Sequence, residues 1–546
     1  MSSTYDAISL EILWSRLIAI ADESAVTLLR TSFSTIVRES NDYACILMDA
    51  NGDSIAENTG SIASFVRILG KTTKHLMERV GVDDLEPGDV LMTNDPWLGT
   101  GHTPDITIAM PIFREGRIVA WAANCAHSPD MGGSLWSADA REVFEEGLCI
   151  APVKFLEVGR PNKTLIDIVR ANVRTPDLTI GDMYAQVAAA EVCAKRLLEL
   201  MDEQAIDDLV PIVAEIHGRA ERVMRRAIAD IPDGEYAYAI DTDGHGDRPV
   251  HLQIKIVVDG DEMHLDYTGS SPQVDRGSNS VMNYTAAYTE YPVKCALTPQ
   301  SPKNEGSNRP LHVTAPEGTI VNSVFPAPCS ARQLTGHFLA GLVFGALAPA
   351  IPDKVIADSG GGPCLRTVYS GMSPDGTRFS SVLFASGGMG ATPVKDGLSC
   401  VGFPANTGAG SYEALESVSP LLFWKAELLP DSGGAGKYRG GLAQEVVVEV
   451  LTDEPIVLST MSDRWTHPAF GLFGGLSGSA SSVVLESGAP VNPKGRMMLA
   501  PRERLTIQFA GGGGYGPPEE RDRDAVQRDI DDGLVSMRAA TEIYGL

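Results

Sequence analysis

The sequence predicts an α+β protein with several lobes, in which mixed helices accompany largely antiparallel sheets. Strand-like runs follow one another through short turns, a pattern typical of hairpins rather than of alternating βαβ units. Helical runs are instead grouped, most densely over residues 180–229. At 546 residues, the chain is also longer than one hydrophobic core usually serves, so two or three lobes are expected.

An N-terminal α/β region that holds a metal is predicted over residues 1–230. The apolar residues of its first segment recur close to every 3.6 positions, which favours an amphipathic helix. The dipeptide Asn51-Gly52 follows the first strand-like run and favours a hairpin. The expected elements are a helix over 8–32, a strand over 43–48, a helix over 71–80, strands on both sides of a turn at 114–117, and helices over 180–198 and 210–228.

A central α+β region is predicted over residues 231–365, and a β-rich C-terminal region with terminal helices over 366–546. The central region alternates apolar and polar residues before a long helical stretch. Its expected elements are strands over 236–243, 251–258 and 263–267 and helical sequence over 331–350. Gly-rich turns separate the strands beyond residue 366, and helices are expected again over 523–533 and 536–544.

Composition excludes several classes of function. The net charge of −27 predicts an acidic surface that repels nucleic acid and anionic membranes. The eight cysteines include no C-x-x-C pair, so we expect free thiols in a reducing cytosol and no cysteine-ligated zinc. Neither a secretory signal nor an apolar run long enough to span a bilayer is visible. These features predict a cytoplasmic protein.

The segment 94–105, Asn-Asp-Pro-Trp-Leu-Gly-Thr-Gly-His-Thr-Pro-Asp, carries the strongest chemical signal. It places His102 and Asp105 three residues apart among turn-forming residues. His127 ends the second strand after the turn at 114–117, so pairing of the two strands would bring it beside the 102–105 loop. Imidazole and carboxylate groups that converge favour a divalent cation. A histidine near a strand end is more often a surface group, and spacing alone leaves both interpretations open.

Two segments resemble phosphate-binding loops, and neither fits. Leu69-Gly70-Lys71-Thr72 looks like the end of a P-loop, but Phe65 stands where that pattern requires glycine. The run 511–516 matches G-x-G-x-x-G after a strand, yet two prolines follow and no βαβ unit surrounds it. We expect a tight-turn or interface role for this run and no nucleotide site on this chain.

The segment 94–105 and the run Ala126-His127-Ser128-Pro129-Asp130-Met131-Gly132-Gly133 together resemble the signature of the hydantoinase B/oxoprolinase family. The resemblance extends nearly end to end, through residues 39–43, 172–176, 266–273, 316–318, 412–416, 431–441 and 511–517. This family includes B-type subunits of ATP-dependent N-methylhydantoinases and caprolactamases and the C-terminal halves of 5-oxoprolinases. Related subunits occur in acetone and acetophenone carboxylases.

The resemblance implies a ligand set for one divalent transition metal. The early Asp, the His and Asp of the turn and the later His correspond to Asp42, His102, Asp105 and His127. Two carboxylates and two imidazoles suit Zn²⁺, Mn²⁺ or Fe²⁺ better than Mg²⁺ or Ca²⁺.

Other residues near these ligands carry weaker expectations. Asp95 and Asp130 flank the set and are candidate catalytic groups, either to orient the ligands or to take a proton from water. Cys125 shares the strand face of His127 and is expected to pack in the core. The family often carries a His-x-Gly motif before a helix, whereas residues 60–70 contain no histidine, which puts the substrate preference in doubt.

The resemblance also implies that two subunits carry out successive steps of the reaction. A separate hydantoinase A-type subunit with an actin-like ATPase site would phosphorylate the carbonyl oxygen of a hydantoin, oxoproline or lactam. The metal of the B-type subunit would then supply hydroxide to the activated carbon. Two alternatives remain: a subunit of a ketone carboxylase of the acetone or acetophenone type, and a non-catalytic scaffold. Retention of all four implied ligands argues against the scaffold.

Overall fold

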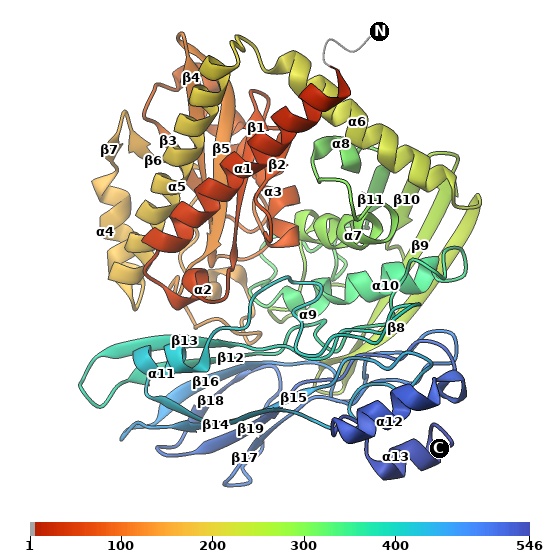
Figure 1. Cartoon of the computed structure of the whole chain (residues 1–546). Coiled ribbons are helices and arrows are strands. Elements are labelled where there is room, and N and C mark those ends of the chain that lie inside the picture. Colours follow the sequence, from red (N-terminus) through yellow and green to blue (C-terminus); the bar gives the residue numbers. More distant parts are fainter. Residues whose placement is uncertain (1–5) are drawn as a thin grey trace.

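The computed structural model describes residues 6–546 and confirms the predicted α+β class (Figure 1). The strands form one seven-stranded sheet and three four-stranded sheets. All the strand pairs described are antiparallel except β10 (Glu262–Asp266) with β11 (Leu311–Thr314). Among the helices of residues 6–546, none is long and apolar enough to cross a lipid bilayer.

The seven-stranded sheet lies between helices. The side chain of Leu47 packs in the core that contains α1 and α5, whereas its neighbours Ile46 and Met48 pack in the core that contains α3. This alternation is what the period of two along a strand requires when both faces are buried. The strand order is β2 (Ser54–Glu57), β1 (Tyr43–Asp49), β5 (Arg117–His127), β4 (Asp105–Arg114), β3 (Val90–Thr93), β6 (Val153–Glu157) and β7 (Arg160–Pro161). The surrounding helices are α1 (Ala7–Thr31), α2 (Thr35–Arg38), α3 (Ala63–Val80), α4 (Lys163–Asn172) and α5 (Pro176–Glu203).

Helix α3 begins eight residues before the predicted start at residue 71, so that expectation was wrong at its N-terminal end. Gly70 lowers the intrinsic helix propensity of this stretch. Tertiary packing compensates, because Phe65, Val66 and Leu69 are buried against the sheet. The early start matters for function, because it places the first turn of α3 beside the candidate site described below.

The central sheet has the order β11-β10-β9-β8 and packs against helices. Strand β9 shows the predicted alternation, with Leu252, Ile254 and Ile256 fully buried. Strands β8 (Gly234–His245) and β9 (Arg248–Asp259) contain two of the predicted strands and pair as a long hairpin. The helices that accompany this sheet are α6 (Val210–Ala229), α7 (Met282–Leu297), α8 (Glu305–Asn308), α9 (Gln333–Gly336) and α10 (Phe338–Leu347).

Two four-stranded sheets share one core in the C-terminal part of the chain, at the bottom of Figure 1. The first has the order β13 (Arg378–Phe384), β12 (Arg366–Met372), β16 (Ile456–Met461) and β18 (Arg496–Leu499). The second has the order β14 (Leu421–Leu428), β15 (Gln444–Val450), β19 (Arg504–Gln508) and β17 (Ser482–Leu485). Three short helices complete this part: α11 (Tyr412–Val418), α12 (Arg523–Asp531) and α13 (Met537–Glu542).

The glycine run 511–516 is buried and bound to other backbone segments. The N–H groups of Gly512, Gly513 and Gly514 donate to the carbonyl oxygens of Gly441, Asp358 and Leu476, at 3.0, 2.8 and 2.9 Å respectively. Because these donors are already satisfied, they are not available to hold a phosphate. The structure therefore supports the interface role that the sequence predicts for this run.

Close backbone approach makes glycine essential in the segments that face this run. A Cβ at Gly388 would lie 1.8 Å from the carbonyl oxygen of Gly441, whereas a Cβ at Gly410 would make only ordinary contacts. We expect Gly388→Ala to lower the free energy of unfolding by about 3 kcal/mol, because backbone cannot move aside as a side chain can. Gly410→Ala should change it by less than about 0.5 kcal/mol. Denaturant unfolding of both variants is the measurement, and equal stabilities would contradict this account.

Candidate metal centre

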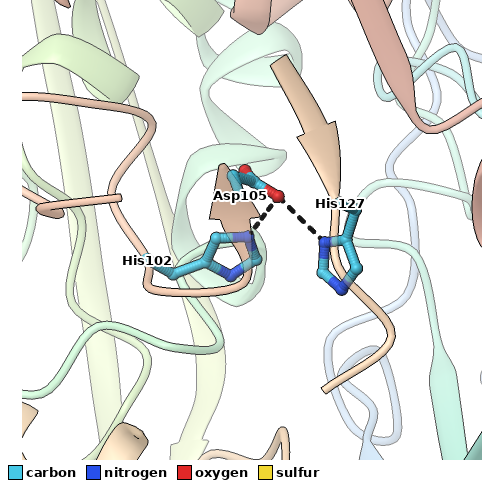
Figure 2. Close-up of side chains that lie close together, drawn as sticks. All are labelled: His102, Asp105 and His127. Carbon is cyan, nitrogen blue, oxygen red and sulfur yellow. Dashed lines mark hydrogen bonds and ion pairs between the residues drawn. The ribbon is translucent and has the colours of Figure 1, made fainter. Parts of the chain in front are cut away.

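The hairpin β4–β5 assembles the centre of the candidate site. Its two strands are joined by the predicted turn, and their register pairs Asp105 directly with His127. His102 lies in the preceding loop, three residues before Asp105. Figure 2 shows the three side chains converging from these elements. All three are buried, with 1 to 3 % of their surface exposed.

One carboxylate oxygen of Asp105 faces both imidazoles. Its Oδ1 lies 2.8 Å from Nε2 of His102 and 2.9 Å from Nδ1 of His127. Its Oδ2 accepts hydrogen bonds from Oγ1 of Thr100 and Nη2 of Arg332, each at 2.6 Å. Because Thr100 and Arg332 satisfy Oδ2, the carboxylate is held with Oδ1 directed toward the two histidines.

The backbone around residue 330 fixes the tautomer of His102. Nδ1 of His102 lies 2.8 Å from the carbonyl oxygen of Ser330, which only accepts, so Nδ1 carries the proton and Nε2 carries a lone pair. The carboxylate of Glu146 in turn accepts the N–H groups of Cys329 and Ser330, both at 2.7 Å. These contacts direct the lone pair of His102 at Asp105.

A cation fits between these groups. Nε2 of His102 is buried without a hydrogen-bond partner, although it lies 2.8 Å from Oδ1 of Asp105. A lone pair and a carboxylate oxygen repel each other at that distance unless a positive charge lies between them. Two ligand atoms about 2.1 Å from one metal and at right angles to each other are separated by about 3.0 Å, which matches this geometry. Asp42 adds a second carboxylate, with Oδ2 3.9 Å from Nδ1 of His127.

The protonation states of these side chains also suit a cation. Burial and the nearby Arg332 guanidinium lower the pKa of His102 to about 4, which keeps the imidazole neutral. Burial alone would raise the pKa of Asp105, but the positive charge of the Arg332 guanidinium helps to hold it well below its usual range. Burial raises the pKa of Asp42 to about 6. A neutral imidazole beside an ionised carboxylate is the protonation state that a divalent metal requires.

The cluster lines a cavity of about 40 Å³. Its walls include residues that sequence reasoning missed, because they come from segments far along the chain: Trp136, Tyr284, Tyr288, Arg332, His337 and Arg366. The guanidinium of Arg332 lies 4.2 Å from the ring centre of Tyr284. Gly101, with φ of +93°, makes room for Arg332, because a Cβ there would lie 2.6 Å from its Cδ. The one signal in the sequence was the pair of basic residues Arg332 and His337, which comes just before the wholly apolar α10.

A histidine reaches the cavity in spite of the missing family motif. Ser64, in the first turn of α3, lines the cavity in the region where the family often has histidine. His337 lies on the same cavity, with Nε2 3.2 Å from the hydroxyl of Tyr284. The N–H of Cys364 donates to its Nδ1 at 3.3 Å, so Nε2 carries the proton and donates to Tyr284. His337 therefore holds the hydroxyl of Tyr284 in place at this wall.

The two flanking carboxylates do not line the cavity. Oδ1 of Asp95 accepts the N–H of Trp97 at 2.9 Å, the contact that shapes its own turn. Asp95 faces a separate pocket near Phe144. Oδ1 of Asp130 accepts Nη1 of Arg174 at 2.6 Å. The contacts of both are those of loop-shaping groups, and their catalytic roles stay predictions. Cys125 is fully buried in the core beneath α3, as expected.

Thr100 offers a test of how Asp105 is held. Thr100→Val keeps the volume of the side chain but removes the donor to Oδ2 of Asp105. We expect about 10- to 100-fold weaker metal binding, because a less oriented carboxylate is a poorer ligand. Thr73→Val is the matched control, since it removes a buried hydrogen bond to Leu69 within α3. Competition with a chromogenic chelator measures both affinities, and equal values would contradict the orienting role.

Comparison with known proteins places the chain in a family. The family model described as hydantoinase B/oxoprolinase matches residues 6–518. The chain belongs to this family. The resemblance seen in the sequence is thereby confirmed over nearly its whole length.

Individual relatives agree with the hydantoinase B/oxoprolinase assignment. The putative B-type subunit of a D-/L-hydantoinase from Pseudomonas sp. is 31% identical over 99% of this chain and 95% of its own. The crystal structure of ATP-dependent caprolactamase from Pseudomonas jessenii superimposes with a TM-score of 0.92 at 28% identity, over 99% of this chain and 96% of that chain. A nucleotide-free acetone carboxylase structure gives a TM-score of 0.90 at 22% identity, over 99% and 79%, and shares the fold.

Proposed function

We propose that this chain is the B-type subunit of an ATP-dependent cyclic amide hydrolase, acting on a hydantoin, oxoproline or lactam. The observation that carries the proposal is the buried cluster centred on Oδ1 of Asp105, with the unpartnered Nε2 of His102 directed at it. Relatives named as the B-type subunit of a hydantoinase and as an ATP-dependent caprolactamase support the substrate class and the subunit type.

Asp42, His102, Asp105 and His127 would hold one divalent transition metal, Zn²⁺, Mn²⁺ or Fe²⁺. Such an ion acts as a Lewis acid and lowers the pKa of water into the neutral range. The chain's own residues prepare the site for it: Thr100 and Arg332 orient the carboxylate of Asp105, and the Ser330 carbonyl orients His102.

Activation of the substrate belongs to a partner in this proposal. An unstrained amide is a poor electrophile, and conversion of its oxygen to a phosphate ester gives the carbon a good leaving group. The glycine run 511–516 cannot cradle a phosphate, because its N–H groups are bound to other backbone. We therefore assign ATP use to a hydantoinase A-type subunit in a hetero-oligomer. The eight free thiols suit a reducing cytosol.

The size of the cavity limits what can enter it. A volume of about 40 Å³ holds about two or three water molecules but no cyclic amide. The walls would therefore have to move apart for substrate to enter. If they moved back around it, a reactive phosphorylated compound would be shielded from bulk water.

Reconstitution with the A-type partner is the experiment that tests the proposal. We expect ATP-dependent opening of a hydantoin, oxoproline or lactam when both chains are present, and none with either chain alone. Liquid chromatography of the product and a phosphate assay give the ratio of product to ATP cleaved. Calorimetry on this chain alone should show no sub-micromolar affinity for ATP. Sub-micromolar binding, or turnover without the partner, would contradict the assignment.

A ketone carboxylase subunit is the second candidate. Arg332 and Arg366 both line the cavity, and positive charge there suits a carboxylate or bicarbonate. The reconstituted enzyme distinguishes the two functions. Turnover of a ketone that requires bicarbonate would favour the carboxylase, whereas turnover of a cyclic amide without bicarbonate would favour the hydrolase.

A further inference from the structure

We propose that Glu262, His264 and His312 form a second site for a divalent transition metal, on the outer face of the central sheet where β10 pairs with the edge strand β11. The three residues could each offer one ligand atom, and these atoms all lie within 4.8 Å of one another. The site is separate from the buried cluster around Asp105, and nothing in the proposed hydrolase requires it.

The register of the sheet brings the side chains together. Strands β10 and β11 run parallel, with His264 opposite His312 and Met263 opposite Leu311. Met263 and Leu311 are buried in the core, so the neighbouring pair of histidines points to the other face. Glu262 precedes His264 by two residues and shares that face. Backbone pairing therefore fixes the positions of all three groups.

The distances suit ligation after small side-chain rotations. The rings of His264 and His312 stack, with centres 4.7 Å apart and planes 21° apart. Nε2 of His312 lies 3.1 Å from Oε2 of Glu262. Ligand atoms of one zinc ion are separated by about 3 to 3.5 Å, given bond lengths of about 2.1 Å. Glu262 and His312 already satisfy this separation, and rotation of the exposed His264 ring about its χ angles would complete the set.

Arg225 of α6 prepares the carboxylate. Its Nη1 lies 3.1 Å from Oε1 of Glu262, which leaves Oε2 directed at His312. Two imidazoles and one carboxylate suit Zn²⁺, Ni²⁺ or Cu²⁺ rather than Mg²⁺ or Ca²⁺. Three protein ligands leave at least one position to water.

An ion here would join the edge strand to the rest of the sheet. Because the ligands are on the surface, the ion should exchange readily with the solution. Zinc bound only by the folded protein raises the thermal midpoint of unfolding, by a few degrees when free zinc is well above the dissociation constant. Strand β11 leads, through the segment after residue 314, to Ser330 and Arg332 of the buried site.

The test uses the untagged full-length chain, dialysed against a weak chelator and then titrated with ZnCl₂. We expect calorimetry and elemental analysis to show one zinc more per chain in the wild type than in His264→Ala/His312→Ala. Glu262→Gln should weaken zinc binding, because it removes the carboxylate ligand but leaves both imidazoles in place. His251→Ala is the matched control, because this exposed strand histidine pairs with one carboxylate, Asp241, at 2.8 Å.

A variant of the buried site tests whether the two metal sites are independent. In His102→Ala, the extra zinc and the zinc-dependent rise in thermal midpoint should both persist. The proposal fails if the wild type takes up no more zinc than His264→Ala/His312→Ala. It also fails if His251→Ala removes the extra zinc as fully as that double variant does.

Discussion

Asp105→Asn should fold normally, lose its metal and stop forming product. The amide can place its oxygen where Thr100 and Arg332 now bind Oδ2, and its NH₂ group where Oδ1 faces the lone pair of His102. The substitution thus gives the unpartnered Nε2 of His102 a hydrogen-bond donor and leaves no room for a cation. We expect product formation by the reconstituted enzyme to fall by at least about 10²-fold.

The partner's ATP cleavage should continue in part, because phosphorylation precedes the step that this chain carries out. ATP consumed per product formed is the measurement, alongside metal content and the thermal midpoint. Asp182→Asn is the matched control: this buried carboxylate lies outside the cavity, and asparagine can also accept the N–H groups of Phe33 and Ser34, so metal and product formation should be retained. Normal product yield in Asp105→Asn at unchanged metal content would refute the role of the cluster.

The second large effect concerns the histidines. His102→Ala and His127→Ala should each lose the tightly held metal, about one per chain after dialysis against a weak chelator, because each removes an imidazole ligand. Circular dichroism should show a folded protein in both.

His217→Ala is the control that separates burial from ligation. His217 is buried, with Nε2 2.8 Å from the carbonyl oxygen of Ser54, and lies outside the cluster. Its loss should cost stability but not metal. Full metal occupancy in His102→Ala/His127→Ala, measured by elemental analysis, would disprove the ligand set.

The parts of the site that could be predicted are those fixed by local structure. A short turn joins β4 and β5, and the hairpin, with one register shift between Ile112 and Phe113, places His127 opposite Asp105. Local patterns also predicted the strands that became β8 and β9 and the two terminal helices, because turn residues and periodicity act over a few positions.

The parts that could not be predicted depend on contacts between distant segments. Ser330 and Arg332 reach His102 and Asp105 across more than two hundred residues, through packing that no local pattern encodes. Asp95 shows that closeness in sequence is also an incomplete guide. It lies close to the ligands in sequence, but its carboxylate is used by its own turn. Proximity along the chain does not fix the direction of a side chain.

The narrow cavity has a consequence for how the protein exchanges its metal. The proposed ligands come from β1, the 94–105 loop and β5, and residues from the distant segments around Arg332 and Arg366 line the same cavity. A space of about 40 Å³ holds about two or three water molecules, so a cation must shed most of its hydration shell before it reaches the ligands. The rate at which a chelator removes the ion would then report how far the cavity opens in solution.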